Sequence, residues 1–440
     1  MNQPMLSAHF ASRKPSDIRL AQEKFTARRV KPQAVINVSI GNVSLPMNPA
    51  MQERMFGLDA PDSPFSGGAM RYTDTAGTTE CRDAFKNILH CEGFAAEKLL
   101  VQITDGASAA MELLLLGVCG PAGTHEKPLL LIDPAYTNYL SLAKRIGRHT
   151  VAVKRCLNQD GKFALPRLDE IEKVIQDSRP GALVVIPYDN PTGQLYDYGT
   201  MTALARLCVK YNMWMVSDEA YRELYYDEAT KKLVSIWGIT DAEVPGIEGR
   251  RIGLETSSKV WNACGLRIGA MITDNAAFHD GAVAEYTANL CANAIGQYIF
   301  GALAHQSREQ IAAWCKKCRD YYRQQIMMVY NGLKQEEPGL IVSSPDAAIY
   351  SVVDVKNVVK PGFDATEFVL YCAEQGSVSI DGVDTTLLVS PMDGFYDHQA
   401  AADHPWKSQF RISYVETPQN LAKIPALFVK LLRQYEEYRA

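Results

Sequence analysis

Short apolar runs recur along the middle of the chain, and each one stops at a polar or turn-forming residue. These runs are Leu129–Ile132, Ala182–Ile186, Trp214–Val216, Arg251–Leu254 and Ile268–Ile272. Short runs without polar alternation are typical of strands buried on both faces of a parallel sheet. Stretches with the helical spacing of apolar residues separate several of them, namely Asn138–Arg145, Leu168–Asp177 and Tyr198–Tyr211. Strands that alternate with helices predict an α/β domain whose mostly parallel sheet is flanked by helices.

The pattern changes towards the C-terminus. A long helical region is predicted over Ala302–Leu333, and the chain beyond Gly339 mixes strands with helices. The strands are expected at Leu340–Val342, Ile349–Val353 and Phe410–Tyr414, and the helices at Ala365–Gln375 and Pro418–Tyr435. This mixture predicts a smaller α+β domain. We therefore expect a large domain over residues 51–310, a small domain over 311–440 and an N-terminal segment, 1–50, that packs with the small domain.

Composition excludes several classes of protein. The chain has 440 residues, a net charge of −5 and 22% charged residues, which gives no sign of binding to nucleic acid or an anionic membrane. No apolar run approaches the roughly 20 residues that span a bilayer, and Met1–Arg13 lacks the apolar core of a secretory signal. The ten cysteines are scattered, which predicts reduced thiols in a cytoplasmic protein. Cys315 and Cys318 form a CxxC without a second pair, so we expect packing and no metal site.

Polar residues follow four of the apolar runs in succession. They are Asp133–Tyr136, Tyr188–Gly193, Ser217–Tyr221 and Thr256–Lys259. Each segment alone is more typical of a turn or a helix start than of a ligand site. In an open α/β sheet, however, ligands bind at the carboxyl ends of the strands, so four such segments favour a single ligand site.

The last of these segments carries the most specific chemistry. Lys259 lies among hydroxyl and apolar residues, and Arg267 follows eight positions later. An ammonium group that is removed from water has a lowered pKa, and its amine can form a Schiff base with an aldehyde. Thr256 and Arg267 are suited to a phosphate dianion. An aldehyde and a phosphate on one ligand indicate pyridoxal 5'-phosphate (PLP), although the segment alone is also typical of a surface lysine.

Three motifs in order resemble the aspartate aminotransferase superfamily, which comprises the fold-type I, PLP-dependent class I/II aminotransferases. They are Asn190–Gly193, Asp218–Tyr221, and Thr256–Lys259 with Arg267. The resemblance extends over nearly the whole chain through Met70–Gly77, Asp105–Ala109 and Gln409–Ser413. It implies that the large domain holds PLP.

The resemblance also implies a role for each matching residue at the cofactor ring. Lys259 is similar to the lysine that holds PLP as a Schiff base and then moves a proton during catalysis. Asp218 resembles the catalytic carboxylate that pairs with the pyridine nitrogen. Asn190 and Tyr221 resemble the residues that bind the ring's phenolic oxygen, and Tyr136 resembles the aromatic residue that stacks on the ring.

Further residues match the family at the phosphate and the substrate. Ala107, Ser108, Thr256 and Arg267 resemble the phosphate site, where backbone N–H groups at a helix start attract a dianion. Tyr72 resembles a tyrosine that reaches the phosphate of the neighbouring subunit, which implies a homodimer. Arg411 resembles the arginine that binds the substrate α-carboxylate, while Gly41 and Asn190 resemble positions that line the substrate pocket.

Two features depart from the family pattern. Asp189 stands immediately before Asn190, and we expect it to place a negative charge near the pocket. Residues 380–408 align poorly with the segment that borders the substrate in the family. The motifs also offer no second arginine for a distal carboxylate.

The resemblance predicts an aminotransferase that moves an amino group from an L-amino acid to a 2-oxo acid by a ping-pong Schiff-base mechanism. A PLP-dependent lyase that catalyses β-elimination is an alternative, because the same lysine and ring serve both reactions. A non-catalytic, PLP-binding regulatory protein is less favoured, because only about 35 residues precede the family-like region, too few for a DNA-binding domain. The sequence does not identify the amino donor or the acceptor.

Overall fold

A seven-stranded sheet forms the centre of the larger part of the molecule. The computed structural model describes residues 4–227 and 234–439. The strands, in the order in which they lie side by side, are β2 (Leu100–Thr104), β10 (Gly269–Thr273), β9 (Arg251–Thr256), β8 (Trp214–Asp218), β7 (Ala182–Val185), β3 (Leu129–Asp133) and β4 (Thr150–Lys154). Neighbouring strands from β9 to β4 are parallel, and β10 is antiparallel to both β2 and β9. The predicted mostly parallel sheet is confirmed.

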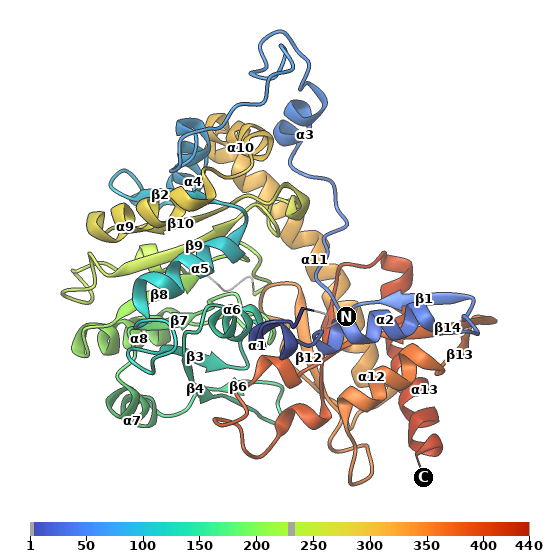
Figure 1. Cartoon of the computed structure of the whole chain (residues 1–440). Helices are drawn as coiled ribbons and strands as arrows, with labels where there is room; N and C mark the ends of the chain where they lie inside the picture. Colours follow the sequence, from blue (N-terminus) through green and yellow to red (C-terminus); the bar gives the residue numbers. More distant parts are fainter. Residues whose placement is uncertain (1–3, 228–233, 440) are drawn as a thin grey trace.

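Helices cover both faces of this sheet (Figure 1). Alternate residues of β3 show the two cores: Leu129 and Leu131 belong to one buried cluster, and Leu130 and Ile132 to the other. The first cluster includes side chains of α5 (Ala107–Val118), α6 (Asn138–Arg145) and α9 (Ala276–Tyr286). The second includes side chains of α4 (Thr79–Cys91), α7 (Leu168–Ser178), α8 (Tyr198–Lys210) and α10 (Ala294–Gly301). Burial on both faces explains why the strands lack polar alternation.

The C-terminal part contains two smaller sheets. One is antiparallel and has the order β11 (Ile341–Val342), β12 (Tyr350–Asp354), β16 (Gln409–Ser413) and β15 (Ser390–Pro391). The other has the order β1 (Ala34–Asn37), β14 (Val383–Leu388) and β13 (Val378–Ile380), with β1 parallel to β14. Helices α12 (Ala365–Glu374) and α13 (Pro418–Tyr438) pack here, and α2 (Asp17–Ala27) lies against α12. The N-terminal segment therefore contacts the C-terminal part, while the three domain boundaries stay a prediction.

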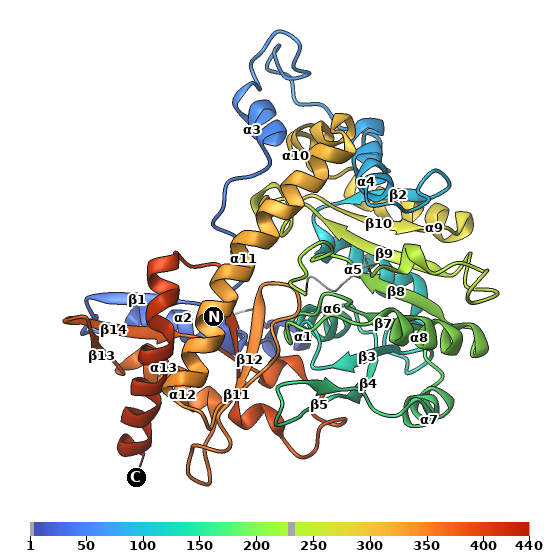
Figure 2. The same ribbon diagram turned by 180° about the vertical axis from the view of Figure 1, so that it is seen from behind.

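Helix α11 (Arg308–Glu336) extends from the region of α4 and α10 to α13, as Figure 2 shows. The helical region predicted over Ala302–Leu333 consists of two helices. A short 3-10 helix, η4 (Ala302–His305), comes first, and α11 then begins anew at a capping box. In that box the Ser307 hydroxyl accepts a hydrogen bond from the Gln310 N–H, and the Gln310 side chain accepts one from the Ser307 N–H.

The remaining elements are short. They are α1 (Ala8–Ala11), α3 (Pro49–Phe56), β5 (Cys156–Leu157) and β6 (Phe163–Ala164), together with the 3-10 helices η1 (Ile236–Gly238), η2 (Cys264–Leu266), η3 (Thr287–Asn289), η5 (Asp393–Phe395) and η6 (Pro405–Ser408). The segment that joins α3 to α4 projects from the molecule at the top of both views (Figures 1 and 2). Within the described residues, no helix is both long and apolar enough to cross a membrane.

Candidate active site

A cavity of about 670 Å³ opens where the carboxyl ends of β7, β8 and β9 face the start of α5 and the strands β12 and β16. It brings together eleven of the twelve predicted site residues: Gly41, Ala107, Ser108, Tyr136, Asn190, Asp218, Tyr221, Thr256, Lys259, Arg267 and Arg411. A larger hollow of about 1010 Å³ lies near the start of β8, at the opposite end of the strands, and none of the predicted residues lines it. The chemistry therefore belongs to the smaller cavity.

The start of α5 forms an anion cradle with Arg267. Gly106 precedes the helix with φ of 75° and without a side-chain cap, so the first N–H groups lack a helical partner. A Cβ atom on Gly106 would lie 2.3 Å from Nη2 of Arg267, and one on Gly269 would lie 2.5 Å from the Ala107 nitrogen. Two glycines thus let the guanidinium and a strand approach the helix start. Unpaired N–H groups beside a guanidinium suit a phosphate dianion.

Two hydroxyl groups complete the cradle at the end of β9. The Thr256 hydroxyl donates to the Ser258 hydroxyl over 2.8 Å and accepts the Ser258 N–H over 3.1 Å. Ser258 also lines the cavity. It was not among the predicted site residues, although it belongs to the same hydroxyl-rich motif.

Lys259 follows these residues, and its Nζ donates a hydrogen bond of 2.5 Å to the Gly41 carbonyl oxygen. Gly41 lies against a further cavity residue, because a Cβ atom there would come 2.0 Å from the Tyr350 hydroxyl oxygen. Glycine is therefore required at position 41 for this close approach. The N-terminal segment and the sheet of the large part meet at the lysine.

Asp218 ends β8 and is buried. Removal from water raises the pKa of its carboxyl from 3.8 to about 6, although two hydrogen bonds oppose this change. The Tyr139 hydroxyl donates to Oδ2 over 2.9 Å, and the Ala220 N–H donates to Oδ1 over 3.2 Å. Tyr139 was missed from the sequence because it lies within the apolar pattern of α6, which is typical of packing.

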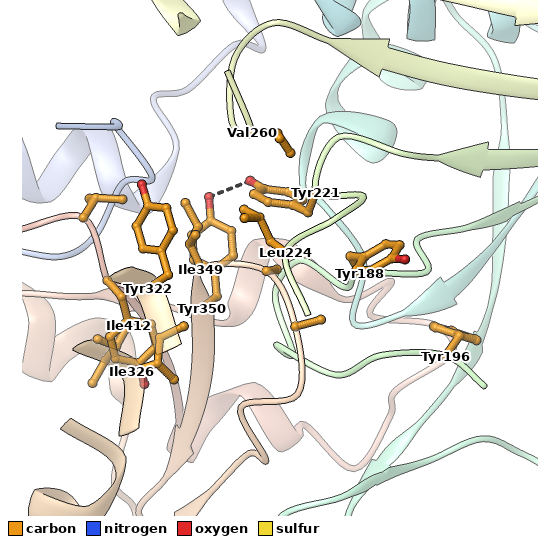
Figure 3. Close-up of a cluster of buried hydrophobic side chains, with 14 of the residues drawn as sticks. Tyr188, Tyr196, Tyr221, Leu224, Val260, Tyr322, Ile326, Ile349, Tyr350 and Ile412 are labelled. Atoms are coloured by element: carbon orange, nitrogen blue, oxygen red, sulfur yellow. Dashed lines mark hydrogen bonds between the residues drawn. The ribbon is translucent and has the colours of Figure 1, made fainter. Parts of the chain in front are cut away.

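Tyr221 contacts a second tyrosine that the sequence did not indicate. Its hydroxyl oxygen lies 2.9 Å from that of Tyr350, at the start of β12, and the dashed line in Figure 3 marks this contact. Burial, followed by the proximity of Tyr350, raises the pKa of Tyr221 well above its usual value. Burial also raises the pKa of Tyr350, but the nearby cations Lys259 and Arg411 and the hydrogen bond with Tyr221 outweigh it, so the net pKa is lowered. Either hydroxyl can be the donor in this pair.

Arg411, on β16, is held from several sides. Nη1 donates to Oδ1 of Asn190 over 3.0 Å, and Nη2 donates to the Ser39 carbonyl oxygen over 2.7 Å. The guanidinium lies over the rings of Tyr350 and Phe395, 4.3 and 4.9 Å from their centroids. Its buried Nε has no hydrogen-bond partner among the described residues. A donor thus remains for a ligand. Phe395 comes from the poorly aligned segment 380–408, which therefore borders this site.

The Asp189 carboxylate lies near the pocket, as expected, because it contributes to the raised pKa of the cavity residue Asp218. It does not line the cavity itself: it is buried and forms an ion pair of 2.5 Å with Nη1 of Arg155. The Thr192 hydroxyl donates to the same carboxylate oxygen over 2.5 Å. The Arg155 guanidinium therefore neutralises the negative charge of Asp189, the residue that precedes Asn190.

Tyr72 does not join the other site residues within one chain. Its side chain is 79% exposed on the projecting segment between α3 and α4. It lines a separate hollow of about 480 Å³ together with Phe65, Arg71 and Tyr298. Its predicted role at a neighbouring subunit therefore stays a prediction.

A family model described as aminotransferase class I and II matches residues 35–423. The chain belongs to this family. Among curated relatives of this aminotransferase, the probable N-succinyldiaminopimelate aminotransferase DapC of Mycobacterium tuberculosis is 28% identical over 215 residues, 48% of this chain and 50% of the relative. The match thus spans about half the length of that relative. The aspartate aminotransferase of Sulfolobus acidocaldarius is 24% identical over 346 residues, 74% of this chain and 80% of the relative.

Solved structures show the same fold as this aminotransferase. The N-succinyldiaminopimelate aminotransferase from Mycobacterium tuberculosis has a TM-score of 0.78 at 21% identity, covering 97% of this chain and 100% of that one. A single mutant of Thermus thermophilus aspartate aminotransferase has a TM-score of 0.77 at 22% identity, covering 98% and 100%. The predicted family and fold are confirmed.

Proposed function

We propose that this aminotransferase uses pyridoxal 5'-phosphate to move an amino group from an L-amino acid to a 2-oxo acid in a ping-pong reaction. The observation that carries the proposal is the convergence of Lys259, Asp218, the anion cradle and Arg411 on one cavity. Each group suits a different part of the same cofactor and substrate. No turn or packing role requires all four to face one space.

The residues present fit this cofactor. The unpaired N–H groups of Ala107 and Ser108, with Arg267 and Thr256, suit its phosphate. Asp218 suits its ring nitrogen, because a carboxylate beside a pyridinium keeps the nitrogen protonated. Bound PLP supplies an aldehyde that reacts with amino groups and a ring that withdraws electrons from the substrate's α-carbon.

The chain's own residues then orient the ring and move the proton. Tyr139 donates to Asp218 and so holds its carboxylate in position. Tyr221 and Asn190 supply hydrogen bonds for the ring's phenolic oxygen. Tyr136 lines the same cavity, where its side chain can stack on the face of the cofactor ring. Lys259 transfers the proton at the substrate's α-carbon once its amine is free.

Arg411 is the residue that binds the α-carboxylate of the substrate. Its buried Nε has no partner among the described residues, and a carboxylate would satisfy it with a charge-assisted hydrogen bond. Tyr350 and Phe395 hold the guanidinium by ring contacts, so its position is fixed before substrate arrives.

We also propose that the enzyme is a cytoplasmic homodimer. Every cysteine in the described parts of the chain is a free thiol, which fits a reducing compartment. The exposure of Tyr72 on a projecting segment fits a residue that serves a neighbouring subunit.

The purified protein with bound PLP tests the proposal. Borohydride reduction followed by peptide mass spectrometry should find the cofactor on Lys259, and Lys259→Ala should bind PLP without turnover. A panel of amino donors should convert the cofactor to pyridoxamine phosphate, as measured by absorbance. Release of pyruvate and ammonia would identify a lyase, and an adduct on another lysine would overturn the site.

A further inference from the structure

Arg155 is a buried cation that the proposed reaction leaves without a role. It directly follows β4, its side chain is 3% exposed, and it does not line the active-site cavity. A buried guanidinium is costly unless carboxylate and carbonyl oxygens satisfy it. The hydrogen bonds of Arg155 therefore indicate which segments of the chain it holds.

The Arg155 guanidinium joins the ends of two neighbouring strands, β3 and β7. At the end of β3, Nη2 donates to the carbonyl oxygens of Ile132 over 3.3 Å and of Pro134 over 2.5 Å. Beyond the end of β7, Nη1 forms the ion pair with Asp189. A planar guanidinium offers these donors in a fixed fork, whereas a lysine ammonium would keep the charge and lose the fork.

The segment beyond β7 leads to one support of Arg411. Asp189 immediately precedes Asn190, whose Oδ1 accepts the hydrogen bond from Nη1 of Arg411 over 3.0 Å. The ion pair that holds Asp189 therefore also holds the backbone from which the Asn190 amide reaches Arg411.

The segment beyond β3 holds a second support, Phe395. The Ala135 N–H donates to the Phe395 carbonyl oxygen over 2.9 Å. Oδ2 of the buried Asp133 accepts the Asp397 N–H over 2.5 Å. The Arg411 guanidinium lies over the Phe395 ring, 4.9 Å from its centroid. A second route thus leads to the same guanidinium.

We propose that Arg155 is a positioning residue for substrate binding, which holds Arg411 in the place where it receives the α-carboxylate. The inference rests on the proposed function, because that function assigns the α-carboxylate to Arg411. Both routes run through features that depart from the family pattern, namely Asp189 and the segment 380–408. The resemblance to the family therefore assigns no such role to Arg155.

Arg155→Lys tests this role with the positive charge retained. KM for amino acids and 2-oxo acids should rise about threefold to tenfold, while kcat changes less than about twofold, because carboxylate binding is impaired and the chemistry is not. Arg251→Lys is the matched control. Arg251 is also buried, forms a 2.6 Å ion pair with Asp274 and donates to the Ile239 carbonyl oxygen over 2.8 Å. It begins β9, at the end of the strand remote from the active site, so its variant should leave KM unchanged.

A double-mutant cycle with Arg411→Lys separates positioning from general support of the fold. If Arg155 acts through Arg411, then Arg155→Lys should raise KM in the wild-type background and not further in Arg411→Lys. Asp189→Asn is a second variant of the same contact, which keeps the shape of the side chain. It should raise KM in the same sense.

Calorimetry on the PLP-bound protein gives a readout without turnover. The probes are butanoate and butanamide, which have the same shape and differ in charge. Wild type should bind butanoate more tightly than butanamide, and Arg155→Lys should reduce this preference, whereas Arg251→Lys should retain it.

The outcomes separate the two proposals. An active enzyme in which Arg155→Lys leaves KM unchanged, or raises it equally in the wild-type and Arg411→Lys backgrounds, would overturn the positioning role and leave the proposed function intact. Wild-type protein that transaminates no donor would overturn the proposed function, while a butanoate preference that depends on Arg155 would still support the positioning role. The same loss of preference in Arg251→Lys would show a general effect on the fold and overturn the inference.

Discussion

The hydroxyl oxygen of Tyr350 lies 2.9 Å from that of Tyr221 and joins the two parts of the molecule at the active site. Tyr221 follows β8 of the large sheet, whereas Tyr350 begins β12 of the smaller one. Either hydroxyl can donate in this pair, and the cations near Tyr350 lower the pKa of its hydroxyl. The contact therefore holds the Tyr221 hydroxyl oxygen in position before any ligand binds.

Tyr350→Phe should reduce turnover and keep the fold. The ring and its contact with Arg411 remain, but Tyr221 loses the partner that orients its hydroxyl. One neutral hydrogen bond is worth about 0.5–1.5 kcal/mol, so kcat should fall roughly 2- to 10-fold in steady-state assays. Tyr322→Phe is the control, because the buried Tyr322 hydroxyl in the same cluster has no hydrogen-bond partner among the described residues (Figure 3). Equal kcat in the two variants would contradict the role of Tyr350.

Asp218 should make the cofactor-free protein less stable as pH rises from about 4 to 6. Folding raises the pKa of this carboxyl from 3.8 to about 6, so in that window the folded state binds a proton that the unfolded state has released. Stability falls with pH wherever the folded state holds more protons, by up to about 3 kcal/mol for this shift. Asp218→Asn removes the titration. Urea unfolding at a series of pH values should therefore show that the free energy of unfolding of the variant rises relative to that of wild type as the pH increases to about 6. Parallel pH profiles would refute the assignment.

The buried pair of Asp189 and Arg155 should be sensitive to loss of one partner. Asp189→Ala leaves the Arg155 guanidinium buried and without its counter-charge, which costs about 3–5 kcal/mol in unfolding free energy. Asp320→Ala is the control, because its ion pair with Lys316 is solvent-exposed and such pairs contribute about 1 kcal/mol or less. Similar urea midpoints for the two variants would argue against a structural role for the buried pair.

Residues that end the strands of the large sheet could be placed from the sequence. An apolar run followed by a polar motif locates the carboxyl edge of a parallel sheet, so Asn190, Asp218 and Lys259 were expected together, and they line one cavity. The apolar pattern also located the helix that starts after Gly106, whereas the phosphate role of that helix start was implied by the resemblance to the family.

Residues brought in by tertiary packing could not be placed in this way. Tyr350 is separated from Tyr221 by 129 positions and lies on a strand of another sheet. Tyr139 lies on an amphipathic helix, where a tyrosine is typical of the core. The pairing of Asp189 was not expected because its partner Arg155 lies on another segment, and a charge pattern along the chain does not reveal such a pair.

The last prediction concerns Tyr72, which is exposed and remote from the cavity of its own chain. In a shared-site homodimer, each active site combines Lys259 of one subunit with Tyr72 of the other. Homodimers of Lys259→Ala or of Tyr72→Ala should therefore have two defective sites. Subunits of the two variants, mixed under conditions of exchange, should form heterodimers in which one site carries both changes and the other carries none.

Mixing should consequently restore activity, up to about half of the wild-type value per heterodimer, because the unmodified site has its full set of residues. Steady-state assays of isolated heterodimers, tagged differently on each subunit, measure the recovery. A control mixture of Lys259→Ala with Asp218→Ala should instead recover little activity, because both residues belong to one chain's cavity and each site then carries one change. If Tyr72 served its own chain, the Tyr72→Ala mixture would behave like this control, since both sites would remain defective.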